Sequence, residues 1–91
     1  MERCEVTVSR VRQRHSSFFR LTVYHYDSGK YINNVFFQYS WLKSYAKKIG
    51  IDVKELPYLK DVRCNGYFFR TNANTDLDWK EELRNWYKER E

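Results

Sequence analysis

The first part of the chain alternates between apolar and polar positions, the pattern of strands with one buried face. The alternation predicts three strands, at residues 4–11, 18–26 and 31–39. Residues 13–17 form the predicted loop between the first two strands. Asp27-Ser28-Gly29 has the composition of a turn and joins the second strand to the third.

Helical spacing replaces this alternation after the third predicted strand. Ser40 is the predicted N-cap, and Gly50 stands where glycine commonly follows a helix end. Asp52 and Glu55 have capping-box spacing, which predicts one short helical turn before Pro57. The apolar stripe of the main helix consists of Trp41, Leu42, Tyr45, Ala46 and Ile49.

The rest of the chain predicts a second hairpin and a second helix. Residues 61–64 and 67–71 are predicted strands, joined by Asn65-Gly66, a residue pair that strongly favours two-residue hairpin turns. Thr75 is the predicted N-cap of the last helix. The apolar stripe of that helix consists of Trp79, Leu83, Trp86 and Tyr87.

Together these elements predict an α+β domain in the order β-β-β-α-β-β-α. About five strands, in two hairpin units, would form a small antiparallel sheet packed by two amphipathic helices. A chain of 91 residues fits one domain, so we expect residues 1–91 to form a single compact unit.

Charge is unevenly distributed along the chain, whose formal net charge is +5. Residues 76–91 contain six acidic and four basic residues, which leaves a net charge of +7 on the other 75 residues. Such a positive field attracts polyanions or acidic protein surfaces. Nucleic acid and an acidic protein are therefore the two predicted classes of partner.

The first candidate for a binding surface is the basic part of the N-terminal strands. No acidic residue lies between Glu5 and Asp27. Guanidinium groups pair with phosphate oxygens, so the arginines of this stretch are candidate nucleic-acid contacts. They are Arg10, Arg12, Arg14 and Arg20.

The second predicted strand adds aromatic rings to this surface, because Tyr24 and Tyr26 share a strand face with Arg20. Exposed tyrosine rings stack on bases, which favours a platform for single-stranded nucleic acid. In the alternative interpretation, Phe18 and Tyr24 pack beneath a helix and the arginines are only solvated.

The lysines of the first predicted helix are a second candidate. Lys43, Lys47 and Lys48 lie off its apolar stripe, where they can reach phosphates. The alternative is a solvated helix face.

Two patterns are similar to DNA-binding folds. Residues 45–59 have apolar spacing like that of a helix-turn-helix, which would place a second helix at 52–60. Pro57 falls inside that helix, where a proline costs about 3 kcal/mol, so we do not adopt the motif. The start of three strands and a helix is similar, in element order alone, to small sheet domains that certain integrases and plant transcription factors place in the major groove of DNA.

Patterns for metal binding and catalysis are weak. Cys4, His15, His25 and Cys64 lack the spacing of a zinc site, and no phosphate-binding glycine loop exists, so we expect no metal and no cofactor. The two cysteines are predicted to pack as small apolar residues, and His25 as a satisfied core or edge histidine. One enzyme class stays open, a small basic ribonuclease that would use His15, His25 and the arginines.

The last predicted helix carries two indoles, Trp79 and Trp86. We expect them to dock on the sheet, and the alternative is that they anchor a partner or a second copy in a homodimer. The N-terminus has no apolar signal region, and no apolar stretch is long enough to span a membrane. The expected location is therefore cytoplasmic, with no membrane contact.

The leading hypothesis is a non-enzymatic nucleic-acid-binding protein that uses a basic, aromatic sheet face and a lysine-bearing helix. The competing hypothesis is a small interaction module or inhibitor, of viral or mobile-element type, that docks on an acidic protein surface. The residue pattern does not choose between DNA and RNA. The predicted nucleic-acid contacts are Arg10, Arg12, Arg14, Arg20, Tyr24, Tyr26, Lys43, Lys47 and Lys48.

Overall fold

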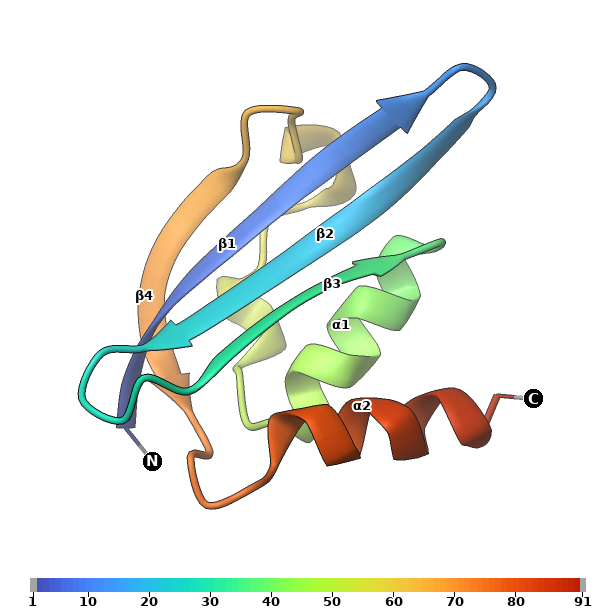
Figure 1. Cartoon of the computed structure of the whole chain (residues 1–91). Helices are drawn as coiled ribbons and strands as arrows, with labels where there is room; N and C mark the ends of the chain where they lie inside the picture. The colour runs from blue at the N-terminus through green and yellow to red at the C-terminus, as the bar shows by residue number, and fades with distance from the viewer. Residues whose placement is uncertain (1, 91) are drawn as a thin grey trace.

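Four strands pair into one antiparallel sheet in the order β3-β2-β1-β4 (Figure 1). This computed structural model describes residues 2–90. The strands are β1 (Glu2–Gln13), β2 (Ser16–His25), β3 (Tyr31–Phe36) and β4 (Tyr67–Ala73). The helices are α1 (Tyr39–Lys48) and α2 (Trp79–Lys88), and two 3₁₀ turns, η1 (Val53–Glu55) and η2 (Leu59–Asp61), lie between α1 and β4.

The predicted α+β class, the antiparallel sheet and the two helices are confirmed, but the fifth strand is wrong. Residues 61–64 form the end of η2 and a turn in which Gly66 N–H donates to the Arg63 carbonyl (3.1 Å). The same carbonyl accepts from Arg10 N–H of β1 (3.0 Å). The Asn65-Gly66 turn is therefore real, but β4 pairs with β1 instead of with the residues before the turn.

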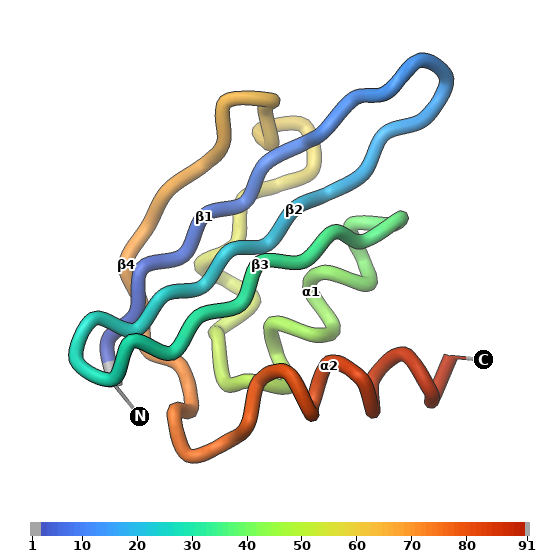
Figure 2. The backbone as a smooth tube through the Cα atoms, viewed as in Figure 1, coloured from blue at the N-terminus to red at the C-terminus, as the bar shows by residue number. Residues whose placement is uncertain are grey.

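Both helices lie on the same side of the sheet. α1 runs behind β2 and β3, and α2 lies along the β3 side (Figure 2). The side chains that face them alternate along each strand, as the period of two predicts. The sheet contributes Cys4, Val6, Val8, Phe19, Leu21, Val23, Ile32 and Phe36 to the core, and the helices contribute Leu42, Tyr45, Ala46, Trp79 and Trp86.

The helix ends differ from the predicted ones at their N-termini. α1 begins at Tyr39 with Gln38 as its N-cap, so the predicted cap at Ser40 is wrong. Asp78 replaces Thr75 as the N-cap of α2, and its carboxylate accepts from the N–H groups of Lys80 (3.1 Å) and Glu81 (3.2 Å).

The predicted C-terminal end of α1 is confirmed. Gly50 follows the helix with a positive φ, and Ile51 N–H donates to the carbonyl of Ala46 (3.0 Å) while Gly50 N–H donates to that of Lys47 (3.0 Å). This pair of bonds satisfies two of the last helical carbonyls. The predicted turn after Asp52 is also present as η1, with Lys54 N–H donating to the Asp52 carboxylate (2.9 Å).

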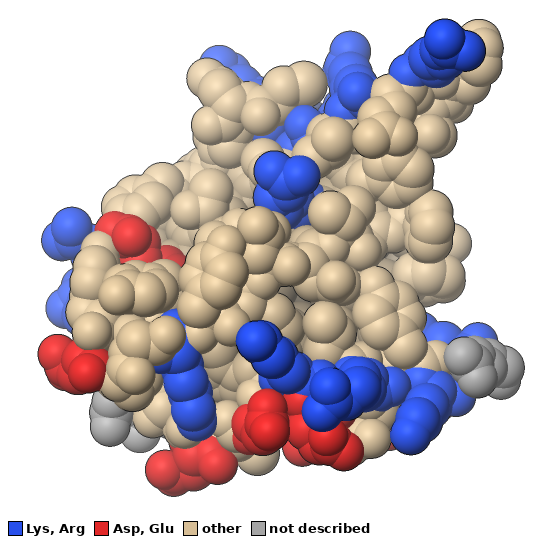
Figure 3. All heavy atoms as spheres, viewed as in Figure 1, with Lys and Arg blue, Asp and Glu red and all other residues tan. Residues whose placement is uncertain are grey.

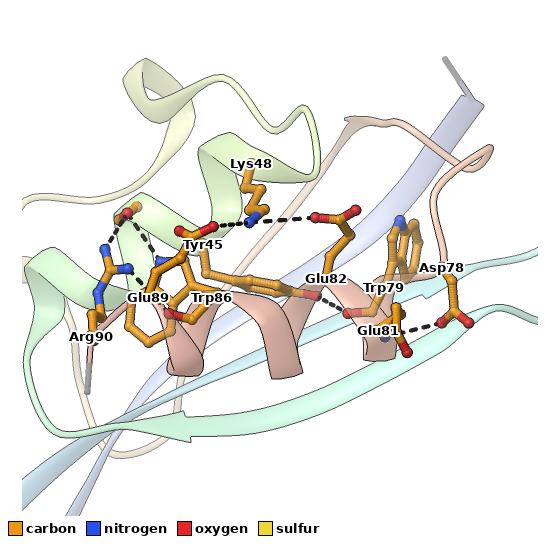
Figure 4. Close-up of polar contacts among 10 residues, drawn as sticks. Tyr45, Lys48, Asp78, Trp79, Glu81, Glu82, Trp86, Glu89 and Arg90 are labelled. Atoms are coloured by element: carbon orange, nitrogen blue, oxygen red, sulfur yellow. Dashed lines mark hydrogen bonds and ion pairs between the residues drawn. The ribbon is translucent and has the colours of Figure 1, made fainter.

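Polar contacts join α1 to α2 around a buried indole (Figure 4). Trp86 Nε1–H donates to Ser44 Oγ (3.1 Å), and the Arg90 guanidinium lies 3.5 Å from the centroid of the Trp86 ring. Tyr45 O–H donates to the carbonyl of Trp79 (2.7 Å). Trp79 and Trp86 are both buried, which confirms the prediction that they are core residues. A homodimer stays a prediction, and these two rings are not at the surface to form its interface.

The outer edge of β3 is partly closed by α2. Tyr87 O–H donates to the Val35 carbonyl (3.1 Å), and Asn34 Nδ2–H donates to the Tyr87 oxygen (2.8 Å). Unpaired groups on an edge strand are a template for unwanted pairing. The Tyr87 hydroxyl satisfies one such group, the Val35 carbonyl of β3.

Two glycines give a matched test of the turns. Gly66 and Gly29 both have left-handed φ values, +90° and +72°, but a Cβ on Gly66 would lie 3.3 Å from Thr7 Cγ2, whereas a Cβ on Gly29 meets nothing within 4 Å. We expect each glycine-to-alanine variant to lose about 1–2 kcal/mol of stability from backbone strain. The Gly66 variant should lose more, because Thr7 must also move. Urea unfolding of both variants measures this, and an equal loss would show that the Thr7 contact costs nothing.

Candidate nucleic-acid interface

The face of the sheet that turns away from the helices is the candidate site, and we call it the open face. The strand register arranges its side chains in rows across the sheet. The first row is Tyr31, Tyr24, Glu5 and Arg70; the second is Asn33, Thr22, Thr7 and Phe68; the third is Val35, Arg20 and Ser9.

Aromatic rings occupy both margins of the open face. Tyr31 on β3 is 46% exposed and Phe68 on β4 is 53% exposed. Tyr24 lies between them in the register, and its ring is 6.4 Å from that of Tyr31 and 5.3 Å from that of Tyr26, both edge-on. The predicted face of β2 is thus correct, and the alternative in which Tyr24 packs beneath a helix is wrong, because both helices lie on the other side.

The one carboxylate in these rows is held by neighbours. Tyr26 O–H donates to Glu5, and this hydrogen bond, followed by partial burial and the negative charge of Glu5, raises the pKa of Tyr26. Arg70 is the register partner of Glu5 on the other side. Glu5 is therefore engaged by a donor, and a basic residue is its neighbour in the same row.

Exposed basic side chains lie in the first and the third row. Arg20 occupies the third row, and Arg70 borders a shallow depression of about 500 Å³ that is also lined by Arg3, Tyr26 and Asp27. Figure 3, in the same view as Figure 1, shows acidic groups only toward the left and lower margins, while the centre and top carry basic groups. The open face therefore offers rings, hydroxyls and cations with little negative charge.

A two-stranded arm extends this surface. We define the arm as residues 11–18, the part of the β1–β2 hairpin beyond the last pair that β2 makes with β3, Phe19 with Phe36. The pairing of β1 with β4 ends earlier along β1, at Val8 opposite Tyr67. Figure 1 shows the arm projecting past the other strands.

The arm ends in exposed basic residues. Arg12 and Arg14 are exposed, and so is His15 beside them. Arg14 has a φ of 31°, in the left-handed region that costs a residue with a Cβ about 1–2 kcal/mol. Such a conformation persists only where the surrounding structure or a function maintains it.

Eight of the nine predicted contacts are divided among three places, and Arg10 lies apart from them. Arg20 and Tyr24 lie on the open face, with Tyr26 at its border, and Arg12 and Arg14 lie on the arm.

The third place is α1, on the far side of the sheet, which carries Lys43, Lys47 and Lys48. Lys48 lies between Glu82 (3.5 Å) and Glu89 (3.4 Å), as Figure 4 shows. Lys43 lies over the Tyr39 ring (5.8 Å), and Lys47 is exposed. The lysine-bearing helix and the open face are therefore two surfaces on opposite sides of the sheet.

The side chain of Arg10 is engaged in contacts within the domain. Its guanidinium lies 5.6 Å from the centroid of the Phe19 ring and donates to the Leu59 carbonyl (3.2 Å). These contacts attach β1 to η2, on the helix side of the sheet.

Tyr31, Phe68 and Arg70 are the open-face residues that sequence reasoning missed. Tyr31 belongs to the predicted third strand, and its alternation with Ile32 was the available signal. Phe68 and Arg70 could be assigned to this face only with the β1–β4 register, which no local pattern contains.

The residues considered for metal binding or catalysis lie apart. Within residues 2–90, no group of three or more His, Cys, Asp or Glu side chains could hold a metal ion. His25 is buried, as predicted, and accepts from Ser28 N–H at Nδ1 (3.1 Å). The two thiols are not bridged; Cys4 is buried, whereas Cys64 is exposed, so its predicted packing is wrong.

Residues 52–60 contain only the two 3₁₀ turns, so the second helix of a helix-turn-helix is not formed there. Among the described helices, none combines the length and the apolar character needed to cross a membrane. Comparison of the chain with protein-family models, with curated proteins and with solved structures gives no match.

Proposed function

We propose that the protein binds single-stranded nucleic acid on the open face and does not catalyse a reaction. The observation that carries this proposal is the row arrangement of the open face, in which three adjacent rows bring together the rings of Tyr31, Tyr24 and Phe68 with the exposed cations Arg20 and Arg70.

The physical basis is the combination of stacking and phosphate pairing. Bases in a single strand expose their faces, so they can stack on aromatic side chains, and each stack contributes about 1–3 kcal/mol. Thr7, Thr22 and Asn33 between the rings supply hydrogen-bonding groups. We expect Arg20 and Arg70 to pair with the phosphates that link the stacked bases.

Binding of labelled oligonucleotides tests the proposal. Fluorescence anisotropy is measured with single- and double-stranded DNA and RNA of one length, at about 50 and 200 mM salt. We expect single strands to bind, with an affinity that falls as salt rises. Each phosphate contact removed should reduce the salt slope by about 0.7 for a single strand.

Two double variants identify the surface. Arg20→Gln/Arg70→Gln removes two cations from the open face, and Lys43→Gln/Lys47→Gln removes two from α1. We expect the first to weaken binding and lower the salt slope by roughly 1.4, and the second to bind like the unchanged protein. The opposite result would assign binding to the lysine helix. If anisotropy does not change with any oligonucleotide, nucleic acid is rejected as the ligand, and an acidic protein partner is favoured.

A further inference from the structure

The arm is not explained by binding of a single strand to the open face. It lies beyond the pairing of both neighbouring strands, and at its base Phe18 contacts Phe37 with ring centroids 5.2 Å apart. Residues 12–17 are all exposed. The end of a hairpin that buries so little contributes little to the stability of the domain, and its side chains are available to a ligand.

The dimensions of the arm fit a DNA groove. About four residues from the base to the tip, at roughly 3.3 Å per residue, give a reach of about 13 Å. The major groove of B-DNA is about 12 Å wide and 8.5 Å deep, and it admits a two-stranded β-ribbon. The deep, narrow major groove of duplex RNA does not admit side chains in this way. The fit is therefore to a DNA duplex.

The chemistry of the arm fits the same ligand. Between Arg10 and Arg20 the chain has no acidic residue, and Figure 3 shows basic but no acidic groups on the projecting hairpin. Arg12 and Arg14 can pair with phosphates or guanine edges, and Gln13, Ser16 and Ser17 are amide and hydroxyl side chains of the kind that contact bases. Arg14 keeps its left-handed backbone at the tip, where glycine or asparagine is the usual choice.

We propose that the arm enters the major groove of a DNA duplex next to the single strand held on the open face. The preferred ligand would then be a junction between double-stranded and single-stranded DNA. The single-stranded half of this proposal rests on the proposed function, whereas contact of the arm with a duplex can be tested without it.

Three DNA ligands separate the two halves. They are a single strand, a blunt duplex, and a duplex with a single-stranded overhang, each labelled and titrated at the same salt concentration. We expect the junction to bind at least tenfold more tightly than either of the other two. A junction that binds no better than the tighter of its two parts would overturn the proposal.

An arm variant assigns this gain to the arm. Arg12→Gln/Arg14→Asn removes both charges, and asparagine tolerates the left-handed backbone at position 14. Lys80→Gln/Lys88→Gln removes the same charge from the exposed side of α2 and is the matched control. We expect the arm variant to lose the junction gain and to keep its single-strand affinity within about twofold, while the control keeps both.

The outcomes distinguish this proposal from the proposed function. If the arm variant loses affinity for the duplex or the junction, the result supports binding of DNA by the arm, even where the single strand alone does not bind. Absence of single-strand binding would reject the open face as a binding surface. If the arm variant binds the junction normally, the proposed role of the arm is wrong, whereas the proposed role of the open face is unaffected. An equal loss of affinity for all three ligands would also reject the role of the arm, because the arm would then contribute only non-specific electrostatic attraction.

Chemical protection locates the arm in the groove. Dimethyl sulfate methylates guanine N7, which faces the major groove. We expect guanines beside the junction to be protected by the unchanged protein and to become reactive with the arm variant. Tight binding with fully reactive guanines would show that the arm contacts only phosphates, and would reject groove entry.

Discussion

Trp86→Ala is expected to lower the free energy of unfolding by about 3–5 kcal/mol. The side chain is 1% exposed, and its ring lies against Phe36 (5.4 Å) and Trp41 (5.9 Å). Its removal also leaves Ser44 without the indole donor and Arg90 without the ring beneath it. Because a domain is stable by only about 5–15 kcal/mol, much of the variant should be unfolded at physiological temperature.

Urea unfolding followed by far-ultraviolet circular dichroism measures this loss without relying on the deleted indole. Trp86→Phe keeps a ring but removes the Nε1–H donor, and we expect it to lose less than the alanine variant. Tyr58→Ala is the control for an exposed ring, since Tyr58 is 78% exposed, and it should change stability by less than about 0.5 kcal/mol. A Trp86→Ala loss below about 1 kcal/mol would contradict its place at the centre of the helix packing.

Tyr31→Ala/Phe68→Ala is expected to weaken single-strand binding by about 30-fold or more. If each ring stacks on one base, the pair contributes about 2–6 kcal/mol, and each 1.4 kcal/mol corresponds to a factor of ten. Both rings are about half exposed on the side of the sheet away from the helices. The loss of affinity should therefore come with little loss of stability. Anisotropy with labelled single strands measures the first, and urea unfolding measures the second.

The conservative variant Tyr31→Phe keeps the stacking surface and should bind within about threefold of the unchanged protein. Tyr58→Ala serves again as control, because it removes an exposed ring outside the rows. Normal binding by the Tyr31/Phe68 double variant would reject the open face as the contact surface, whatever the charge variants show.

The faces of the strands could be predicted because they depend on neighbours in the chain. A side chain in a strand points to the side opposite that of the next one, so Phe19 and Arg20 had to lie on different faces, and they do. The helix C-terminus at Gly50 was similarly local, since its bonds involve residues only three to five positions apart.

The edge strand could not be predicted because its partner is distant in sequence. The Asn65-Gly66 turn favours pairing of the residues on either side of it, but β1 offered a longer partner some sixty residues away, with Val6 opposite Phe69. The placement of Phe68 and Arg70 on the open face depends on that pairing. Likewise, the ion pairs of Lys48 could not be predicted, because its acidic partners are Glu82 in α2 and Glu89 at the C-cap of that helix.

The predicted N-cap residues were wrong for a different reason, because several neighbouring residues could cap each helix equally well. Both Thr75 and Asp78 can cap a helix, and Asp78 does so with two N–H groups. The preceding turn is made instead by Asn74, whose side chain accepts from Asp76 N–H (3.0 Å). Propensity identified a helix start but not its residue.

The unequal lengths of the strands divide one hairpin into two regimes of motion. Near Val6, each strand is hydrogen-bonded to a neighbour and buried under the helices, so its amides should exchange with solvent only when the whole domain opens. Near Arg12, the two strands have only each other, and local fraying suffices. The distal end can therefore open and reclose many times while the core persists, which lets it adjust its shape to a ligand without cost to the fold.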